Sequence, residues 1–155
     1  MGVVGLFAVT AAVSCAWLGS RRLGPLDLAV NKLTQVSSVW TAGFDPAAHV
    51  LIGGDVALLF HTEEQEDPWF LIDLGRPMRI GSVEVVNRVD CCPDRAIPLV
   101  IEARLEDQPY VEVARRTESF ATWLATFTPR EARWVKLHVP RRTIFHLVRV
   151  SVYPP

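Results

Sequence analysis

Proline recurs at short intervals from position 68 onward. It has no amide hydrogen to donate, and its ring clashes with the preceding helical turn, so a helix cannot run through it. Long amphipathic helices are therefore excluded over most of the chain, and short strands joined by turns are favoured. The prolines concerned are Pro68, Pro77, Pro93, Pro98, Pro109, Pro129 and Pro140.

The segments around these prolines are rich in β-branched and aromatic residues, which are typical of strands. Several alternate along their length: Val83 and Val85 fall on one face, and Ser82 and Glu84 on the other. A period of two is that of a half-buried strand. The predicted fold is all-β, a two-sheet sandwich of jelly-roll type. The predicted strands are 56–61, 70–74, 80–87, 99–105, 110–114, 121–127, 134–139 and 148–153.

The chain has 155 residues, of which 50% are hydrophobic, enough for one packed domain. Its 16 basic and 17 acidic side chains give a formal net charge of -1. Nucleic-acid-binding domains are normally basic along one face, so nucleic acid is not an expected partner. Four tryptophans are expected to lie mainly in the core, although any of them that falls in a loop could stack on a sugar: Trp40, Trp69, Trp123 and Trp134.

An uncharged, apolar run extends from Gly2 to Leu18 and is followed by Arg21 and Arg22. Such a run at the start of a chain indicates a targeting or anchoring segment. The positive-inside rule would place the two arginines in the cytoplasm, which points against secretion, whereas the small residues around Cys15 are typical of a cleavage region. We therefore expect a signal peptide or membrane anchor over 1–20, a linker over 21–27, and an exported domain over 28–155, either secreted or tethered.

Two cysteines, Cys91 and Cys92, are adjacent in a segment that follows a predicted strand. Successive Cα atoms lie about 3.8 Å apart, below the usual disulfide range of about 4.4 to 6.8 Å, so a bond between them requires a strained ring. Oxidised, the pair offers a rigid apolar sulfur surface with Arg88 and Arg95 on either side. That arrangement suits a small ligand with one apolar face and several hydroxyl groups. Reduced, the thiols could instead be two small hydrophobic residues, or a metal-binding or redox pair.

Four short segments follow one another along the chain. They are His61-Thr-Glu-Glu-Gln, then Asp67-Pro-Trp-Phe-Leu-Ile-Asp-Leu-Gly, then Asn87-Arg-Val-Asp-Cys-Cys-Pro-Asp-Arg, and finally residues 148–153. Together they resemble fucolectins, the fucose-binding lectins built on a discoidin-type, galactose-binding-like jelly roll. The resemblance covers residues 28–153. The second segment is shared with discoidin domains in general and indicates only the fold. The histidine and the third segment are much more specific to fucolectins.

The resemblance implies a site in which His61, Arg88 and Arg95 bind the ring oxygen and hydroxyls of the sugar, terminal L-fucose or a similar one. It also implies a disulfide between Cys91 and Cys92 that packs against the apolar side of the sugar. Fucose is neutral, so fixed hydrogen-bond donors must select it, and arginine presents a rigid fork of donors. The expected partners are fucosylated glycans or glycoproteins, bound without catalysis.

Asp90 stands two residues after Arg88, where it can hold a guanidinium or the loop backbone before the sugar arrives. A neutral hydrogen bond contributes only about 0.5 to 1.5 kcal/mol, so one such site is expected to bind in the millimolar to tens of micromolar range. Useful avidity then requires several sites, which a homo-oligomer would supply.

Two positions depart from the family pattern where fucolectins carry a structural calcium. Gly53 or Gly54 stands where an acidic residue is expected, and Arg149 stands where a glutamate closes the cage. Calcium takes six to eight oxygen ligands and anionic charge, so we expect the calcium to be lost and no cofactor to be bound. Arg149 is expected to replace the metal by pairing with Asp55 or Asp45.

The alternative function is that of a discoidin-like adhesion domain that binds protein or lipid. Its contacts would come from apolar residues at loop tips, such as Phe44, Leu58 and Leu59. An enzyme is a third interpretation. The sequence has no Ser-His-Asp order with a nucleophile elbow, no convincing carboxylate pair and no phosphate-binding glycine loop, so catalysis is not expected.

Overall fold

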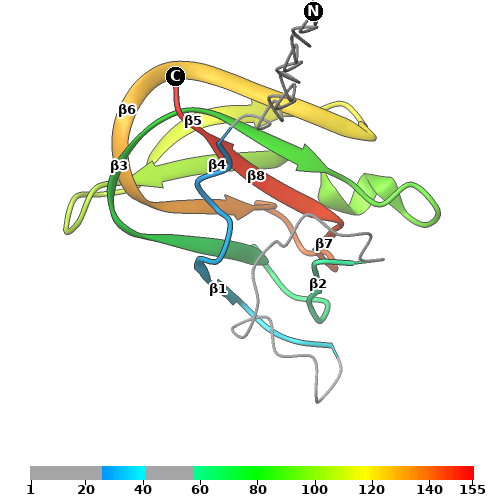
Figure 1. Ribbon diagram of the computed structural model, residues 1–155. Helices are drawn as coiled ribbons and strands as arrows, with labels where there is room; N and C mark the ends of the chain where they lie inside the picture. Colours follow the sequence, from blue (N-terminus) through cyan, green and yellow to red (C-terminus); the bar gives the residue numbers. More distant parts are fainter. Residues whose placement is uncertain (1–25, 41–57) are drawn as a thin grey trace, which may run out of the picture.

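The computed structural model describes residues 26–40 and 58–155, and the regular secondary structure within them is almost all strand (Figure 1). One 3₁₀ turn, η1, spans Pro93–Ala96. The prediction of an all-β fold is confirmed. The strands are β1 (Leu33–Val36), β2 (Phe60–His61), β3 (Trp69–Val86), β4 (Leu99–Arg104), β5 (Val111–Arg116), β6 (Thr122–His138), β7 (His146–Leu147) and β8 (Arg149–Tyr153).

The two longest strands, β3 and β6, each join two of the predicted runs. We expected separate strands on either side of Pro77 and of Pro129, and that prediction is wrong. The β3–β6 register shifts between Asp73 and Met78, and Pro77 lies in that interval. It shifts again between Ile80 and Ser82, opposite the part of β6 that contains Pro129. Proline is tolerated at such irregularities because the ladder of hydrogen bonds is already interrupted there. Figure 1 shows both strands curving together around one side of the molecule.

This curvature folds a single sheet into the two layers of a sandwich. The first half of β3 pairs with β1 and with the end of β6, which also pairs with β4, and β4 pairs with β5. The second half of β3 pairs with β8 and with the start of β6. The predicted sandwich is therefore confirmed, with the core between the two layers. Its largest fully buried side chains include Phe60, Phe70, Ile72, Ile80, Val83, Ile101 and Leu137.

The short strands β2 and β7 form a separate ladder, in which Phe60 is opposite Leu147 and His61 is opposite His146. The turn η1 contacts β7. Figure 1 shows β2 and β7 away from the bend of β3 and β6. Neither β1, with 4 residues, nor β7, with 2 residues, was predicted, because strands this short show too little alternation to be distinguished from loops.

The described part of the domain begins with residues that attach to the last strand. Leu28 and Ala29 are buried, and the amide of Leu28 donates to the carbonyl of Val152 at 2.7 Å. The Asp27 carboxylate accepts hydrogen bonds from the amides of Ala29 and Val152. The predicted targeting segment, 1–20, lies outside the described residues. Within 26–40 and 58–155, no helix has the length and apolarity needed to cross a membrane.

Gly81, in the second half of β3, packs so closely against Pro155 that it leaves no room for a side chain. A Cβ at position 81 would lie 2.8 Å from the Cα of Pro155. We expect Gly81→Ala to lower the free energy of unfolding by about 1 to 3 kcal/mol, measured by urea denaturation, because backbone must shift to relieve the overlap. Deleting Pro155 removes the overlapping atoms, so the substitution should cost less in the shortened chain. An equal cost in both chains would contradict this explanation.

Candidate functional site

A single buried amide holds the segment that follows β3. Asn87 is 2% exposed, and its Nδ2 donates to the carbonyls of Pro93 at 2.9 Å and Phe120 at 3.2 Å. Its Oδ1 accepts a hydrogen bond from the amide of Arg88 at 2.8 Å. These bonds tie both ends of the segment 87–93 to the residues before β6, so the loop has a defined shape of its own. From the sequence we gave Asn87 no role, although an amide directly after a strand is a typical loop anchor.

Asp90 clamps the guanidinium of Arg88 within this loop. The Arg88 Nε donates to Asp90 Oδ1 at 2.7 Å, and Nη2 donates to Oδ2 at 2.9 Å. The pair is bidentate, and this hydrogen bonding lowers the pKa of the Asp90 carboxyl. The clamp leaves Nη1 of Arg88 available as a donor, in a fixed orientation.

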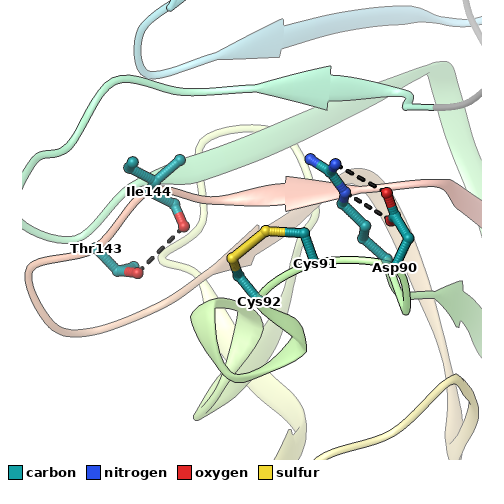
Figure 2. The surroundings of a disulfide bond; sticks show 6 residues. Asp90, Cys91, Cys92, Thr143 and Ile144 are labelled. Atoms are coloured by element: carbon teal, nitrogen blue, oxygen red, sulfur yellow. Dashed lines mark hydrogen bonds and ion pairs between the residues drawn. A yellow bond between two sulfur atoms is a disulfide. The ribbon is translucent and has the colours of Figure 1, made fainter.

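Cys91 and Cys92 are joined by a disulfide, with their Cα atoms 3.8 Å apart. Cys92 adopts a left-handed backbone conformation with φ of 56°, directly before η1. Figure 2 shows the disulfide between Asp90 on one side and the segment that carries Thr143 and Ile144 on the other. Of the two states considered from the sequence, the structure has the oxidised one, in which Cys91 and Cys92 form a disulfide and have no free thiols.

His61 on β2 offers a hydrogen-bond acceptor. Its Nδ1 lies 3.0 Å from the carbonyl oxygen of Thr62. Since a carbonyl only accepts, Nδ1 carries the ring proton and Nε2 keeps a free lone pair. Burial is the main cause that lowers the pKa of His61, and the charges of Arg95 and Arg88 lower it further. The ring is therefore neutral near pH 7.

His146 on β7 lies behind His61 and was not expected from the sequence. The two rings are stacked, with centroids 5.6 Å apart and an interplanar angle of 11°. His146 has no exposed surface, and neither of its ring nitrogens has a hydrogen-bond partner among the described residues. Burial lowers its pKa to about 4, with further contributions from His61, Arg88 and Arg95.

The structure brings the predicted residues His61, Arg88 and Arg95 together. The charges of both arginines act on the rings of His61 and His146, so all of these groups lie at the same end of the sandwich. Arg95 belongs to η1, and its amide donates to the carbonyl of Cys92 at 3.1 Å. Within the described part of the chain its guanidinium has no hydrogen-bond or ion-pair partner. The site therefore combines an acceptor, oriented donors and an apolar sulfur surface.

Arg141, which the sequence analysis did not single out, braces η1 from outside. Its Nη2 donates to the carbonyl of Asp94 at 2.8 Å, and its Nε donates to the carbonyl of Ile97 at 2.8 Å. The position of Arg95 therefore depends on a residue far along the chain, since Arg141 comes 47 residues after Asp94 and 44 residues after Ile97. No local pattern in the sequence could have revealed this contact.

Arg149 pairs with Glu84, and its predicted pairing with Asp55 or Asp45 stays a prediction. Glu84 lies diagonally across the β3–β8 pairing, two residues from Val86, which is the direct partner of Arg149. The predicted partners Asp45 and Asp55, with Gly53 and Gly54, lie outside the described residues. In the described ranges, no three histidine, cysteine or acidic side chains come close enough to hold a metal ion.

The residues expected at adhesive loop tips do not form an apolar tip in the described part of the chain. Leu58 and Leu59 are half-buried, and Leu59 packs against the core. Phe44 lies outside the described residues. Among the tryptophans, Trp123 packs on the core, but Trp40 is 67% exposed, so the expectation that it belongs to the core is wrong.

The profile of the NedA-like, galactose-binding domain family matches residues 51–137, which is more than half of the chain. The chain belongs to the galactose-binding domain family. Within this family the domain is fucolectin-like, which confirms the resemblance: fucolectin-6 of Anguilla japonica is 26% identical over 127 residues, 76% of this chain and 68% of the fucolectin. Other curated relatives are matched over less of their length, 56% for fucolectin-1 of Anguilla japonica and 8% for the pentraxin fusion protein of Xenopus laevis.

Solved structures show the same fold. A fucose binding module of Streptococcus pneumoniae superposes on the galactose-binding domain with a TM-score of 0.72 at 24% identity, covering 85% of this chain and 97% of the module. The lectin domain of lectinolysin, solved in complex with Lewis B antigen, gives a TM-score of 0.70 at 25% identity, covering 84% and 97%. The fold of the domain is therefore matched over nearly the whole length of both solved structures.

The buried, unpartnered ring of His146 predicts that the domain loses stability in mild acid. The folded pKa is about 4 and the ordinary value is 6.5, so between these values the unfolded chain binds the extra proton. The free energy of unfolding should fall as the pH decreases through this window, by up to about 3 kcal/mol from this residue. Urea denaturation of the native protein and of His146→Phe at pH 7 and pH 4 measures the difference, and the variant should lose less stability. Parallel losses in the two proteins would show that His146 does not contribute.

Proposed function

We propose that the domain is a non-catalytic lectin module that binds terminal L-fucose, or a sugar with the same arrangement of hydroxyls. His61, Arg88 and Arg95 would bind the hydroxyls and ring oxygen, and the Cys91–Cys92 disulfide would pack on the apolar side of the sugar. The observation that carries this proposal is that the loop and turn holding Arg88, the disulfide and Arg95 contact β7, the partner strand of His61, and that both guanidinium charges lower the pKa of the His61 imidazole.

The chemistry of the site matches a neutral sugar better than an ion. Each hydroxyl both donates and accepts, and the site offers the His61 Nε2 lone pair together with guanidinium donors. An anion would be held by the arginines alone and would leave the imidazole without a role. A cation would be repelled by Arg88 and Arg95. The solved lectinolysin domain in complex with Lewis B antigen supports the same ligand class.

The site is prepared before the sugar arrives. The Asp90 clamp and the anchored loop hold the Arg88 donors in place, so little conformational entropy is lost on binding. One shallow site of this kind is expected to bind weakly, and an assembly of several copies would raise the avidity. The disulfide is of a kind that persists in oxidising compartments, which supports export of the domain.

Removing the Arg95 side chain tests this function directly. Its guanidinium has no partner among the described residues, so Arg95→Ala should leave the fold intact. We expect the variant to bind L-fucose at least about 10-fold more weakly, since a hydrogen bond from a charged donor contributes about 1.5 to 3 kcal/mol. Isothermal titration with L-fucose measures the affinity.

Arg115→Ala is the matched control, because Arg115 lies on β5 in an exposed ion pair with Glu112. It should bind L-fucose as the native protein does. The proposal fails if the native protein does not bind L-fucose at millimolar concentration, or if Arg95→Ala binds it unchanged.

We also propose that the domain folds without calcium. Arg149 lies on the last strand, where fucolectins are expected to supply a carboxylate to the metal, and it places a cation beside Glu84 of β3 instead. Adding calcium or a chelator should shift the thermal midpoint by less than about 1 °C, because only a ligand that binds the folded state raises its stability. Differential scanning calorimetry measures the midpoint, and a rise of several degrees with calcium would contradict the proposal.

A further inference from the structure

The outer face of the sheet carries a second group of polar and apolar side chains, which the proposed function does not use. On this face Leu33 of β1 lies opposite Asp73 of β3, which lies opposite Trp134 of β6. One step further along the same strands, Gln35 lies opposite Leu71. The residues that alternate with them are buried, namely Thr34, Ile72 and Val135. The five side chains therefore lie together on the solvent side of the sheet.

These five side chains line a groove that is open to solvent, the sheet groove. It holds about 210 Å³ of space, solvent included, which is less than the roughly 300 to 1,000 Å³ of pockets for drug-sized ligands. Its walls are Leu33 and Trp134, on the strands at either side of β3. Neighbouring strands lie about 4.8 Å apart, so the two wall backbones are roughly 10 Å apart and their side chains fill part of that width. A thin group fits between them.

The Asp73 carboxylate is fixed and can still accept one hydrogen bond. Its Oδ1 accepts from Arg133 Nε at 2.9 Å and from the Gly75 amide at 2.8 Å, and its Oδ2 accepts from Arg133 Nη2 at 3.0 Å. A carboxylate has about four lone-pair sites, so these three donors from the described residues leave one site on Oδ2. The Arg133 hydrogen bonds are the main cause that lowers the pKa of Asp73. The group is therefore ionised near pH 7 and only accepts.

Gln35 supplies the complementary group. It is exposed, and its side chain has no hydrogen-bond partner within 26–40 and 58–155. Gln35 is the diagonal neighbour of Asp73 across the β1–β3 pairing, and such neighbours lie about 7 to 8 Å apart. One amide group with a hydrogen bond at each end spans that distance. Its N–H would donate to Asp73, and its carbonyl would accept from the Gln35 amide.

The remainder of the sheet groove is apolar. Leu33 is 69% exposed, and Leu71 is half-buried at the base of the groove. The indole of Trp134 is held by the Arg133 guanidinium, which lies 4.9 Å from the ring centroid. A methyl group attached to the amide would pack among these side chains. The groove thus matches a thin, neutral amide with a methyl group, and the charge of Asp73 disfavours an anion.

We propose that the sheet groove is a second sugar-binding site, which takes the acetamido group of an N-acetylhexosamine residue. The N–H of that group donates to Asp73 Oδ2, its carbonyl accepts from Gln35, and its methyl group packs between Leu33 and Trp134 over Leu71. The pyranose ring stays in solvent above the groove, so the site recognises the acetamido group and little else of the sugar. The inference goes beyond the proposed function, because the two sites share no residue.

Two-dimensional NMR of the isotope-labelled full-length protein tests the site, because it reports where each ligand binds. The probes are methyl β-N-acetylglucosaminide, methyl β-glucoside, which has a hydroxyl in place of the acetamido group, and L-fucose. At millimolar concentration the acetamido sugar should shift the amide signals of residues 33–35 and 71–73, and the glucoside should leave them in place. Gln35→Ala should weaken the acetamido sugar about 2- to 10-fold, through the loss of one neutral hydrogen bond, and leave L-fucose binding unchanged.

Gln108→Ala is the matched control, since Gln108 is an exposed glutamine in the turn after β4 and should affect none of the probes. Leu33→Ala removes an apolar wall without a polar change and should also weaken the acetamido sugar. The site is overturned if the acetamido sugar leaves the groove signals in place or shifts those of residues 87–96 instead. It is equally overturned if the glucoside shifts the groove signals as strongly, or if Gln35→Ala binds the acetamido sugar unchanged. Fucose binding is scored separately: its absence would overturn the proposed function and leave this second site standing.

Discussion

The antiparallel pairing of β3 with β6 is the constraint on which the rest of the fold depends. The two strands stay paired from Trp69 to Val86 and bend together at two register shifts. Because they bend as a pair, one sheet supplies both layers of the sandwich, and every other long strand adds to one half or the other. The loop after Val86 therefore starts from a rigid end of the sheet. The candidate site begins at that end.

Preorganisation of the site uses ordinary hydrogen bonds, most of them at or near the surface. Asn87 fixes the shape of the loop, Asp90 orients one guanidinium, and the Thr62 carbonyl sets the tautomer of His61. Each bond alone contributes modestly to stability, but each removes a freedom that a weakly bound sugar would otherwise have to restrict. The arrangement is what a site for a small neutral ligand requires, because no net charge is available to compensate for poor geometry.

The buried imidazole of His146 is the unfavourable element in this arrangement. Its two ring nitrogens lack partners among the described residues, and a buried polar atom without a hydrogen bond reduces stability. In return, its ring stacks flat on His61 and limits how far that ring can tilt. An apolar side chain at position 146 would remove the buried nitrogens and keep a surface for His61 to pack against. The nitrogens of His146 thus lower the stability of the fold, whereas the flat surface of its ring supports the geometry of the site.

The local motifs could be predicted from the sequence because their residues are close together along the chain. Arg88, Asp90, Cys91, Cys92 and Arg95 occupy one loop, so their spacing already restricts how they can be arranged. The alternation of Val83 and Val85 with polar neighbours likewise predicts a strand without knowledge of its partners. The continuity of β3 through Pro77 could not be predicted, since it depends on the register with β6.

The sequence by itself determined that the chain is an all-β domain with a fucolectin-like loop, because hydrophobic periodicity and motif spacing are local properties. The tertiary structure alone decided which distant residues complete the site. His146 reaches His61 through the β2–β7 pairing, Arg141 braces η1 across the fold, and the exposed Trp40 lies against His61. Those contacts follow from strand register and loop packing, which are set by the balance of interactions over the whole domain, and no short stretch of sequence encodes that balance.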